Sequence, residues 1–303
     1  MMHVLLTGGT GYIGRHLVRV LLERGDSCTV VSRNPRSPGS EDRVRLVQAD
    51  PTGPGPWQTE VEHATAVVNL AGARLVDPPH RWTAARKRVI RDSRIETTRR
   101  LSEAIQQAND PPRVFVSGSA VGYYGSRGDE PLTETAPPGN DFLATLCIDW
   151  ERAARAAEQR TRIVAIRTGL VLGKNSPLLR SMLPAFKLGL GGPWGDGTQW
   201  WPWIHIDDVT GLICHALDGE APGPLNVTAP QPVRVAAFAA ALGKAIGRPA
   251  VARVPGFVLR MALGEVADAL LASQRVVPQR ALAIGYAFRY PDLTSALGNV
   301  FGN

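Results

Sequence analysis

A glycine-rich segment near the N-terminus has the spacing of a phosphate-binding turn. It reads Gly8-Gly9-Thr10-Gly11-Tyr12-Ile13-Gly14 and follows a short apolar run, His3 to Thr7. The first glycine permits a tight turn, the second lets backbone N–H groups approach a phosphate, and the third lets the following helix pack against the strand. Free N–H groups and the positive end of the helix dipole then stabilise phosphate oxygens. The segment predicts a dinucleotide site, although a glycine-rich turn without a ligand is the alternative.

The residues after the second predicted strand indicate which dinucleotide is bound. A protein that selects NAD carries an acidic residue there, which accepts hydrogen bonds from the ribose hydroxyls. This chain instead reads Ser32-Arg33-Asn34-Pro35-Arg36, with no acid. Arg33 could clamp a 2′-phosphate in a forked, charge-assisted contact, and Ser32 could donate another hydrogen bond; Arg33 could also be an ordinary solvated loop residue. The run favours NADP(H) over NAD(H).

Strands that alternate with helices must position these residues. Ile13, Leu17, Val20 and Leu21 form an apolar stripe at helical spacing, which ends near Gly25. Further strands are predicted at 27–32, 44–48, 66–70, 114–117 and 163–168, with helices at 84–107 and 143–159. This alternation predicts right-handed crossovers and a parallel sheet covered on both faces, which is a Rossmann-type, doubly wound α/β fold.

The pattern changes after residue 172. Residues 176–197 combine a short helix with a glycine-rich loop, the next residues include Trp200, Trp201 and Trp203, and strand-like pieces occur near 225–227 and 251–253. We expect residues 1–172, with a return segment at about 204–228, to form the Rossmann domain. Residues 173–203 and 229–303 are expected to form a smaller, mostly helical substrate or cap domain over the C-terminal edge of the sheet. The tryptophans, with Trp194, could wall a substrate pocket or form the core between the domains.

Composition narrows the class of protein further. The 303 residues are 44% hydrophobic and 20% charged, as in globular proteins, and the longest apolar runs are too short to span a membrane. The N-terminus lacks the pattern of a secretory signal, and the scattered Cys28, Cys147 and Cys214 are typical of reduced thiols in a cytoplasmic protein. The net charge of +7 is spread along the chain. We therefore expect a small-molecule substrate, no nucleic-acid or membrane partner, and a monomer or homodimer.

Several further motifs carry a family resemblance. They are Asn69-Leu70-Ala71-Gly72, Ser93-Arg94, Ser117-Gly118-Ser119, Trp150-Glu151, Gly191-Gly192-Pro193, the run 203–208 and Val277-Pro278-Gln279-Arg280. With the glycine-rich segment, they resemble the extended short-chain dehydrogenase/reductase superfamily. The chain is most similar to its atypical branch of epimerase family proteins, in which an NAD-dependent epimerase/dehydratase domain precedes a small C-terminal domain of unknown function.

The resemblance implies a Rossmann fold with an NADP(H) site, and it implies that Leu70, Ala71 and Arg94 line the cofactor. The complete predicted set of cofactor-binding residues is Gly8, Thr10, Gly11, Tyr12, Ile13, Gly14, Ser32, Arg33, Asn69, Leu70, Ala71, Gly72, Arg94 and Ser117.

The residues that perform catalysis in this superfamily are replaced. There, a Tyr and a Lys four residues later exchange a proton with a substrate oxygen, which a nearby Ser holds. An acid normally follows the Tyr by eight positions, so Glu151 places Leu143 at the Tyr position and Cys147 at the Lys position. Leu143 has no proton to transfer, and we interpret Cys147 as an inert core thiol. Ser119 keeps the serine position.

Tyr123 and Tyr124, in the loop after Ser119, could supply the proton or could only pack there. Two functions therefore remain open. One is an NADP(H)-dependent oxidoreductase or epimerase acting on a small, unidentified substrate. The other is a non-catalytic NADPH-binding protein that senses redox state or regulates a partner, for example in cell division.

No metal site is expected. His205 lies near Asp207 and Asp208, but this group lacks a second nitrogen ligand at helical spacing. We interpret it as a structural group at the junction of the two domains.

Overall fold

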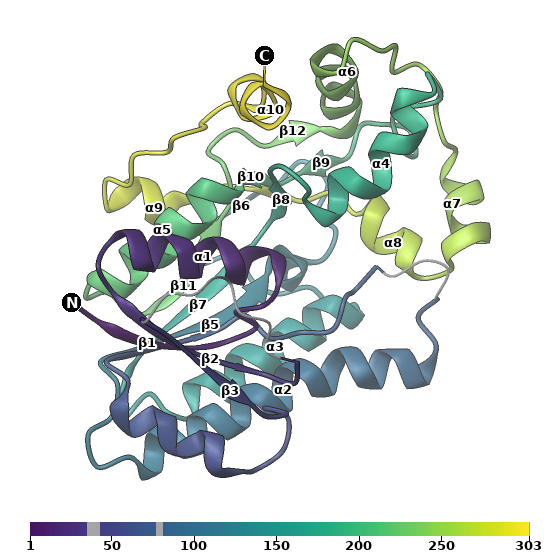
Figure 1. The fold of residues 1–303 in the computed structure, drawn as a ribbon. Coiled ribbons are helices and arrows are strands. Elements are labelled where there is room, and N and C mark those ends of the chain that lie inside the picture. The colour runs from purple at the N-terminus through teal and green to yellow at the C-terminus, as the bar shows by residue number, and fades with distance from the viewer. Residues whose placement is uncertain (35–42, 77–80, 303) are drawn as a thin grey trace.

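Seven parallel strands form the central sheet in the computed structural model (Figure 1), which describes residues 1–34, 43–76 and 81–302. In spatial order they are β11 (Gly223–Val227), β7 (Arg162–Thr168), β5 (Val114–Ala120), β4 (Ala66–Asn69), β1 (His3–Thr7), β2 (Ser27–Ser32) and β3 (Val44–Gln48). The order reverses direction between β1 and β4, and such a switch point leaves a crevice at the carboxyl ends of the strands.

Helices cover both faces of the sheet. One face carries α1 (Tyr12–Glu23) and α5 (Ile206–Asp218), and the other carries the 3-10 helix η1 (Pro56–His63), α2 (Ala84–Gln107) and α3 (Phe142–Arg155). The predicted doubly wound, Rossmann-type fold is confirmed.

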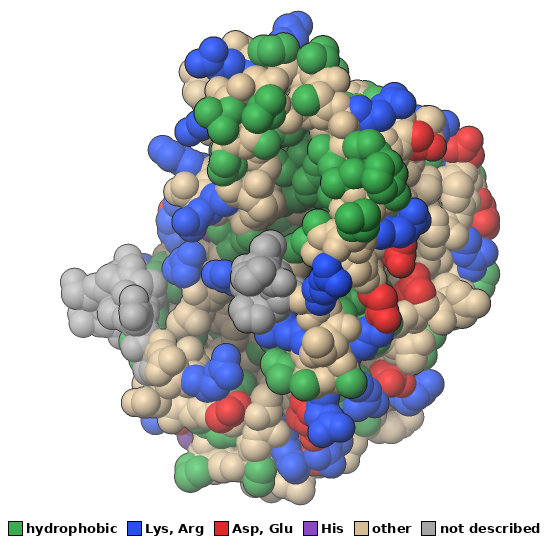
Figure 2. Space-filling model, turned by 90° about the vertical axis from the view of Figure 1, so that its right-hand side faces the viewer, with side chains coloured by type: hydrophobic (Ala, Val, Ile, Leu, Met, Phe, Trp, Pro, Cys, Tyr) green, Lys and Arg blue, Asp and Glu red, His purple; other side chains and the backbone are tan. Residues whose placement is uncertain are grey.

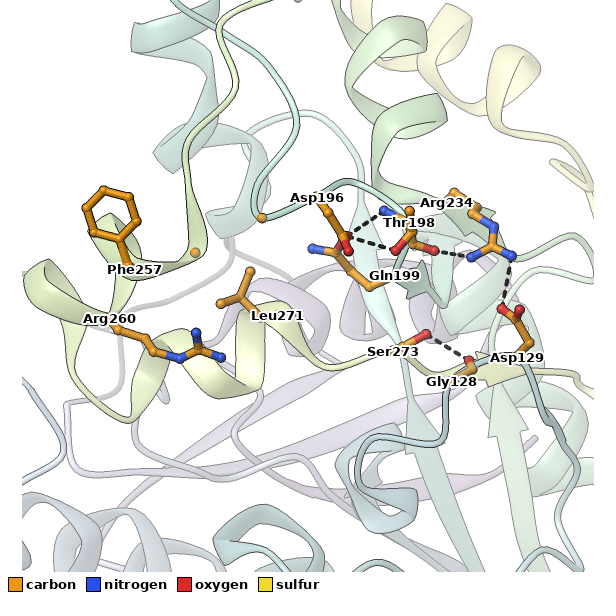
Figure 3. Close-up of a pocket in the computed structure, with 12 residues that line it drawn as sticks. Gly128, Asp129, Asp196, Thr198, Gln199, Arg234, Phe257, Arg260, Leu271 and Ser273 are labelled. Carbon is orange, nitrogen blue, oxygen red and sulfur yellow. Dashed lines mark hydrogen bonds and ion pairs between the residues drawn. The ribbon is translucent and has the colours of Figure 1, made fainter.

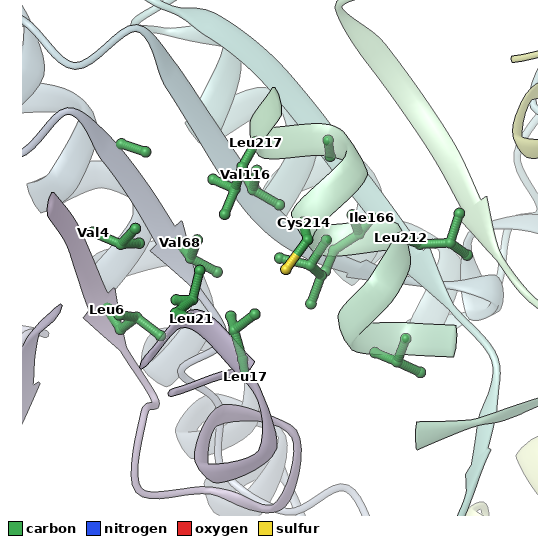
Figure 4. Close-up of a cluster of buried hydrophobic side chains, with 14 of the residues drawn as sticks. Val4, Leu6, Leu17, Leu21, Val68, Val116, Ile166, Leu212, Cys214 and Leu217 are labelled. Atoms are coloured by element: carbon green, nitrogen blue, oxygen red, sulfur yellow. The ribbon is translucent and has the colours of Figure 1, made fainter. Parts of the chain in front are cut away.

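Alternation along β1 explains this layering. Val4 and Leu6 point toward α1, where they pack with Leu17 and Leu21 (Figure 4), whereas Leu5 belongs to the cluster on the opposite face. These side chains are fully buried. Because successive residues of a strand face opposite sides, a continuous apolar run is what a sheet covered on both faces requires.

The C-terminal region is mainly helical, as predicted. Its helices are α4 (Pro177–Lys187), α6 (Val235–Ala245), α7 (Gly256–Leu263), α8 (Val266–Leu271), α9 (Gln279–Ala283) and α10 (Leu293–Phe301). Two short pairs of strands connect it to the described part of the Rossmann region: β8 (Leu170–Leu172) with β10 (Trp203–His205), and β6 (Pro131–Leu132) with β13 (Arg275–Val276). A third pair, β9 (Trp200–Trp201) with β12 (Val233–Arg234), lies within the C-terminal region. The predicted domain boundaries stay a prediction.

The predicted bounds of some elements need correction. The helix expected at 143–159 ends at Arg155 because residues 156–160 form turns, and the strand expected at 114–117 continues to Ala120. The strand-like piece expected at 251–253 is wrong. Residues 251–253 form no strand, and the next residue, Val254, makes a single bridge to Trp194. No helix in the described part of the chain is long and apolar enough to cross a membrane.

Candidate functional site

The glycine-rich segment forms a tight turn between β1 and α1. Gly8 has φ +77, and a Cβ there would lie 2.5 Å from the carbonyl carbon of Leu70. A Cβ on Gly14 would lie 2.2 Å from the carbonyl oxygen of Gly8. Gly11 is the N-cap of α1, where no side chain caps the helix and the first turn carries no acid. The Gly11 N–H donates to the Gly8 carbonyl (2.9 Å), so the uncapped N–H groups at the start of α1 are the ones that the described residues leave for an anion.

Three other predicted residues of this turn have defined surroundings. The Thr10 hydroxyl lies 3.4 Å from that of Ser32, which links the turn to the end of β2. Tyr12 donates a hydrogen bond of 3.2 Å to the carbonyl of Lys174, and burial raises its pKa to about 12. Ile13 packs against the core below α1. Tyr12 therefore ties the turn to the loop after β8.

The end of β2 carries a hydroxyl and an exposed guanidinium. Ser32 is half-buried and Arg33 is exposed, with the Arg33 carbonyl accepting a hydrogen bond of 3.4 Å from the Gln48 amide. The described residues of this run, up to Asn34, include no carboxylate. Pro35 and Arg36, which belonged to the same sequence argument, lie outside the described residues.

Asn69 holds the loop after β4 against β1. Its Oδ1 accepts hydrogen bonds from the Thr7 hydroxyl (2.7 Å) and the Ala71 N–H (3.1 Å), and its Nδ2 donates to Thr98 (2.7 Å). Asn69 is fully buried, and so is Ser117, its paired residue on β5. Both therefore stabilise the carboxyl ends of these strands from inside the protein. Leu70 lies directly beside Gly8 as a result.

Arg94 places a buried positive charge at this edge. Its Nη1 donates to the Ile90 carbonyl (3.0 Å), and its guanidinium lies over the Trp150 ring, 5.3 Å from the ring centroid. A Cβ on Gly72 would lie 2.8 Å from the Arg94 Cζ, so the glycine makes room for this group. Burial lowers the Arg94 pKa to about 10, and no described carboxylate pairs with it. An anionic ligand would offset that cost.

Ser119 belongs to a buried ionic network. Its hydroxyl donates to Glu151 Oε1 (2.7 Å), and Arg167 grips the same carboxylate with Nε to Oε1 at 2.8 Å and Nη2 to Oε2 at 2.9 Å. All three residues are buried. Since a serine hydroxyl has one proton, Ser119 in this arrangement has none left to donate to a substrate oxygen.

The two tyrosines of the next loop differ. Tyr124 is fully buried, donates to Asn226 Oδ1 (2.6 Å) and accepts from Arg167 Nη1 (3.0 Å), and burial raises its pKa to about 12. Tyr123 is half-buried, and its hydroxyl has no partner among the described residues, while the Arg167 guanidinium lies 3.5 Å from its ring centroid. Of the two hydroxyls, that of Tyr124 is therefore engaged by Asn226 and Arg167, and that of Tyr123 is not hydrogen-bonded to any described residue.

At the family's Tyr and Lys positions, this chain has side chains that pack against other residues. Leu143 contacts Gly122 and joins an apolar cluster, and Cys147 is buried with its Sγ 3.6 Å from the Ala120 carbonyl. Burial, reinforced by the Glu151 carboxylate, raises the Cys147 pKa to about 12. The sulfur stays a thiol at neutral pH.

His205 and its neighbours hold the C-terminal segment. The His205 ring lies 4.0 Å from that of Tyr290, and the buried Asp208 carboxylate accepts from the N–H groups of Arg289 (2.8 Å) and Tyr290 (3.0 Å). The described residues contain no group of three or more His, Cys, Asp and Glu that could hold a metal ion.

A cavity of about 590 Å³ lies between the C-terminal region and the loop before β6 (Figure 3). It is lined by Gly128, Asp129, Gly195, Asp196, Thr198, Gln199, Arg234, Gly256, Phe257, Arg260, Leu271 and Ser273. None of the predicted cofactor or catalytic residues lines it, so it is distinct from the edge where β1, β2 and β4 end.

Sequence reasoning missed the role of Arg167 and Asn226. Arg167 sits inside the apolar run of β7, and Asn226 inside β11, and both side chains are buried in contact with Tyr124. A charged residue within a buried strand was an available signal, because such a residue requires a partner.

The comparisons with known proteins agree with this geometry. The model of the NAD dependent epimerase/dehydratase family matches residues 4–228, and a domain of unknown function, DUF1731, matches residues 254–300. Epimerase family protein SDR39U1 of Bos taurus is 41% identical over 303 residues, covering 99% of each chain. Its chloroplastic homolog in Arabidopsis thaliana is 39% identical over 303 residues, covering 98% of this chain and 86% of that protein.

A solved structure extends the likeness to three dimensions. The crystal structure of human epimerase family protein SDR39U1 (isoform 2) with NADPH superimposes with a TM-score of 0.89 at 37% identity, covering 100% of both chains. The family resemblance seen in the sequence is confirmed, and the chain belongs to the NAD dependent epimerase/dehydratase family, among the epimerase family proteins that carry a DUF1731 domain.

Proposed function

We propose that this protein binds NADP(H) along the carboxyl ends of β1, β2 and β4. The turn from Gly8 to Gly14 would hold the pyrophosphate, and Ser32 and Arg33 the 2′-phosphate. The observation that carries the choice of NADP(H) is the run Ser32-Arg33-Asn34 at the end of β2, which offers a hydroxyl and a guanidinium and contains no acid. The Asp50 carboxylate, in the loop after β3, interacts with Arg33 from the side. The NADPH in the human relative's structure supports the choice of NADP(H).

The remaining predicted residues fit the same ligand. Leu70 and Ala71 would border it beside Gly8, and the buried Arg94 would face one of its anionic or polar groups. Thr10, Tyr12, Ile13, Asn69, Gly72 and Ser117 would shape this edge, several of them from within. A bound dinucleotide would supply a negative charge to the Arg94 guanidinium, which pairs with no carboxylate among the described residues.

We further propose an oxidoreductase or epimerase activity on a small substrate. When bound, the nicotinamide ring supplies or takes up a hydride. Tyr123 is the residue that supports this activity, because its hydroxyl has no partner in the described structure and it follows β5 at the edge where the strands end. Ser119 and Tyr124, with their protons engaged, would position it through Arg167 and Glu151.

A non-catalytic NADPH-binding protein is the second candidate. Leu143 and Cys147 favour it, because these positions hold no group that can exchange a proton at neutral pH, and the engaged Ser119 hydroxyl favours it as well. A cytoplasmic location remains part of the proposal, set against a plant relative that is named chloroplastic.

Titration calorimetry with NADPH and NADH tests the cofactor assignment. Arg33→Ala should weaken NADPH binding by about 1.5–3 kcal/mol, the value of a charge-assisted contact, and leave NADH binding nearly unchanged. Arg19→Ala is the matched control, because Arg19 is an exposed arginine on α1 whose recorded partner is Glu23, 3.8 Å away. Equal losses for both nucleotides would refute the 2′-phosphate contact.

Oxidation of NADPH, followed by absorbance with a panel of carbonyl compounds, separates the two functions. An enzyme should turn over at least one compound and lose most of that rate in Tyr123→Phe, with NADPH affinity retained. Ser119→Ala should act mainly through stability. Tight NADPH binding with no turnover across a broad panel would leave the regulatory protein as the function.

A further inference from the structure

Arg94 is a buried cation without an acidic partner in the described structure. The residue is 8% exposed, and no described Asp or Glu forms an ion pair or a hydrogen bond with it. The groups that influence its charge most are the Cys147 thiol and the Arg86 guanidinium, and neither of them is an anion. A buried charge without a counter-charge is costly, so a ligand that brings an anion to Arg94 gains a favourable contact.

The Arg94 guanidinium has one edge without a hydrogen-bond partner. Its Nη1 donates to the Ile90 carbonyl at 3.0 Å, whereas Nε and Nη2 donate to none of the described residues. A Cβ on Gly72 would lie 2.8 Å from Cζ, 3.0 Å from Nη2 and 3.2 Å from Nε. Because Cζ is the nearest of these atoms, Gly72 faces the plane of the guanidinium and not its Nε–Nη2 edge. Two parallel N–H groups on that edge match the two oxygens of a carboxylate.

The guanidinium lies where β4 and β5 end. Gly72 follows β4, and the Trp150 ring, whose centroid is 5.3 Å from the Arg94 Cζ, packs on Gly118 of β5. A Cβ on Gly118 would lie 2.6 Å from that ring, so glycines bring both strand ends close to Arg94 and Trp150. The next residue of β5 is Ser119, which keeps the serine position of the family. Arg94 is therefore beside the predicted reaction site (Figure 2 shows the face of the molecule onto which the ends of these strands open).

The acid that follows Trp150 on α3 is already engaged. The Glu151 carboxylate accepts a hydrogen bond from Ser119 and two from Arg167, at 2.7, 2.8 and 2.9 Å. It is thus neutralised within its own network and leaves the Arg94 charge unpaired.

The proposed dinucleotide brings its phosphates to other places. They lie on the turn before α1 and at the end of β2, and α1 covers one face of the sheet, whereas α2 carries Arg94 on the opposite face. Those phosphates therefore offset the Arg94 charge only at a distance. The anion in direct contact with the Nε–Nη2 edge is left for the second ligand of the site.

We propose that Arg94 binds the carboxylate of the substrate, and that the substrate is a small carboxylic acid with the carbonyl or hydroxyl group on which the protein acts. The two carboxylate oxygens accept from Nε and Nη2 in a forked contact. That this acid is a substrate rests on the proposed function, whereas its binding to Arg94 rests on the unpaired guanidinium.

Calorimetry with saturating NADP⁺ tests the proposal, because the oxidised nucleotide fills its own site without reducing a probe. The probes are pyruvate and 4-oxopentanoate, each compared with its methyl ester, which keeps the carbonyl and lacks the charge. At least one acid should bind, and its ester should bind at least about tenfold more weakly. Arg94→Met should lose at least about tenfold in affinity for the acid, and Arg94→Lys, which keeps the charge without the fork, should lose less.

Arg152→Met is the matched control, because Arg152 is an exposed arginine of α3 whose recorded partner is Asp149, 2.9 Å away. Its affinity for the acids should equal that of the parent. Equal losses in Arg152→Met and Arg94→Met would show an effect of overall charge and overturn the proposal.

Thermal unfolding without ligand separates a binding role of Arg94 from a structural one. Since the unpaired charge is buried at a cost, Arg94→Met should raise the melting temperature of the unliganded protein. The acid should then raise the melting temperature of the parent and not that of the variant. A lower melting temperature in unliganded Arg94→Met would identify a structural cation and contradict the proposal.

The remaining outcomes separate this inference from the proposed function. NADPH binding without binding of either acid overturns the inference and leaves the cofactor assignment standing. Acid binding that requires Arg94, without any NADPH binding, removes the proposed function and leaves Arg94 as the acid site. Binding of inorganic phosphate in place of both acids identifies a phosphorylated ligand and overturns the inference.

Discussion

The carboxyl ends of the parallel strands form one edge of the sheet, and its two parts differ in structure: one lies around β1 and α1, the other around β5 and α3. Around β1 and α1, glycines keep side chains away, as at Gly8 and Gly14, and no side chain caps the N–H groups at the start of α1. Around β5 and α3, side chains fill the space, and the Ser119 hydroxyl, the Glu151 carboxylate and the Arg167 guanidinium satisfy one another below the surface. The part around β1 and α1 leaves room for a ligand, whereas the part around β5 and α3 is filled by side chains that bond to one another.

The difference indicates that the proposed cofactor binding and proton transfer depend on separate parts of this fold. The nucleotide turn depends on backbone geometry within one short stretch of chain, so it survives when residues elsewhere change. The Tyr and Lys positions lie on α3, and there Leu143 and Cys147 extend the core. Loss of the catalytic pair therefore leaves the binding turn intact.

The buried network should give the largest effect. Glu151→Gln leaves the Arg167 guanidinium buried without its counter-charge, which should lower the free energy of unfolding by about 3–5 kcal/mol in urea denaturation. Glu23→Gln, at the exposed pair with Arg19, should cost at most about 0.5 kcal/mol. A loss below 1 kcal/mol for Glu151→Gln would mean that the β5–α3 half is not held by this network.

Crowding the nucleotide turn should give the next largest effect. Gly14→Ala places a Cβ 2.2 Å from the Gly8 carbonyl oxygen, so the turn must open, at a cost of about 1–3 kcal/mol and with loss of most NADPH affinity. Gly53→Ala, whose Cβ would meet no atom closer than 4.0 Å, should change neither the stability nor the affinity. Unchanged NADPH affinity in Gly14→Ala would contradict the conclusion that the part around β1 and α1 depends on its glycines to leave room for a ligand.

The Cys147 thiol should give the smallest effect, visible in the pH dependence of stability. Its pKa is raised from an ordinary value of 9.0 to about 12, so folding favours the neutral thiol. That stabilisation is complete below pH 9 and is lost as the pH rises toward 12, with about 1 kcal/mol gone between pH 8 and pH 10. Urea denaturation across this range should show a shallower decline for Cys147→Ser. Parallel curves for the two proteins would place the thiol in contact with solvent.

Local patterns in the sequence were sufficient for much of the fold. The helix predicted at 84–107 coincides with α2, and the strands predicted at 27–32 and 44–48 coincide with β2 and β3. Each rests on periodicity over neighbouring residues. The piece predicted at 251–253 failed because three residues with one β-branched side chain do not by themselves supply a partner strand, and the structure provides only a single bridge at the next residue, Val254.

The sequence by itself determined the order of strands and helices along the chain, the glycine turn, and the run after β2 that contains no acid. Together with the family resemblance, it also placed Leu143 and Cys147 at the family's Tyr and Lys positions. These are properties of residue type and spacing within short windows. Only the tertiary structure decided that the Ser119 hydroxyl donates its hydrogen bond to Glu151 and that the Tyr124 hydroxyl donates to Asn226. It also decided that Arg94 is buried without an acidic partner among the described residues. Each of these depends on side chains from elements that pack together after the chain has folded, and a hydroxyl or guanidinium can satisfy only a few partners at once.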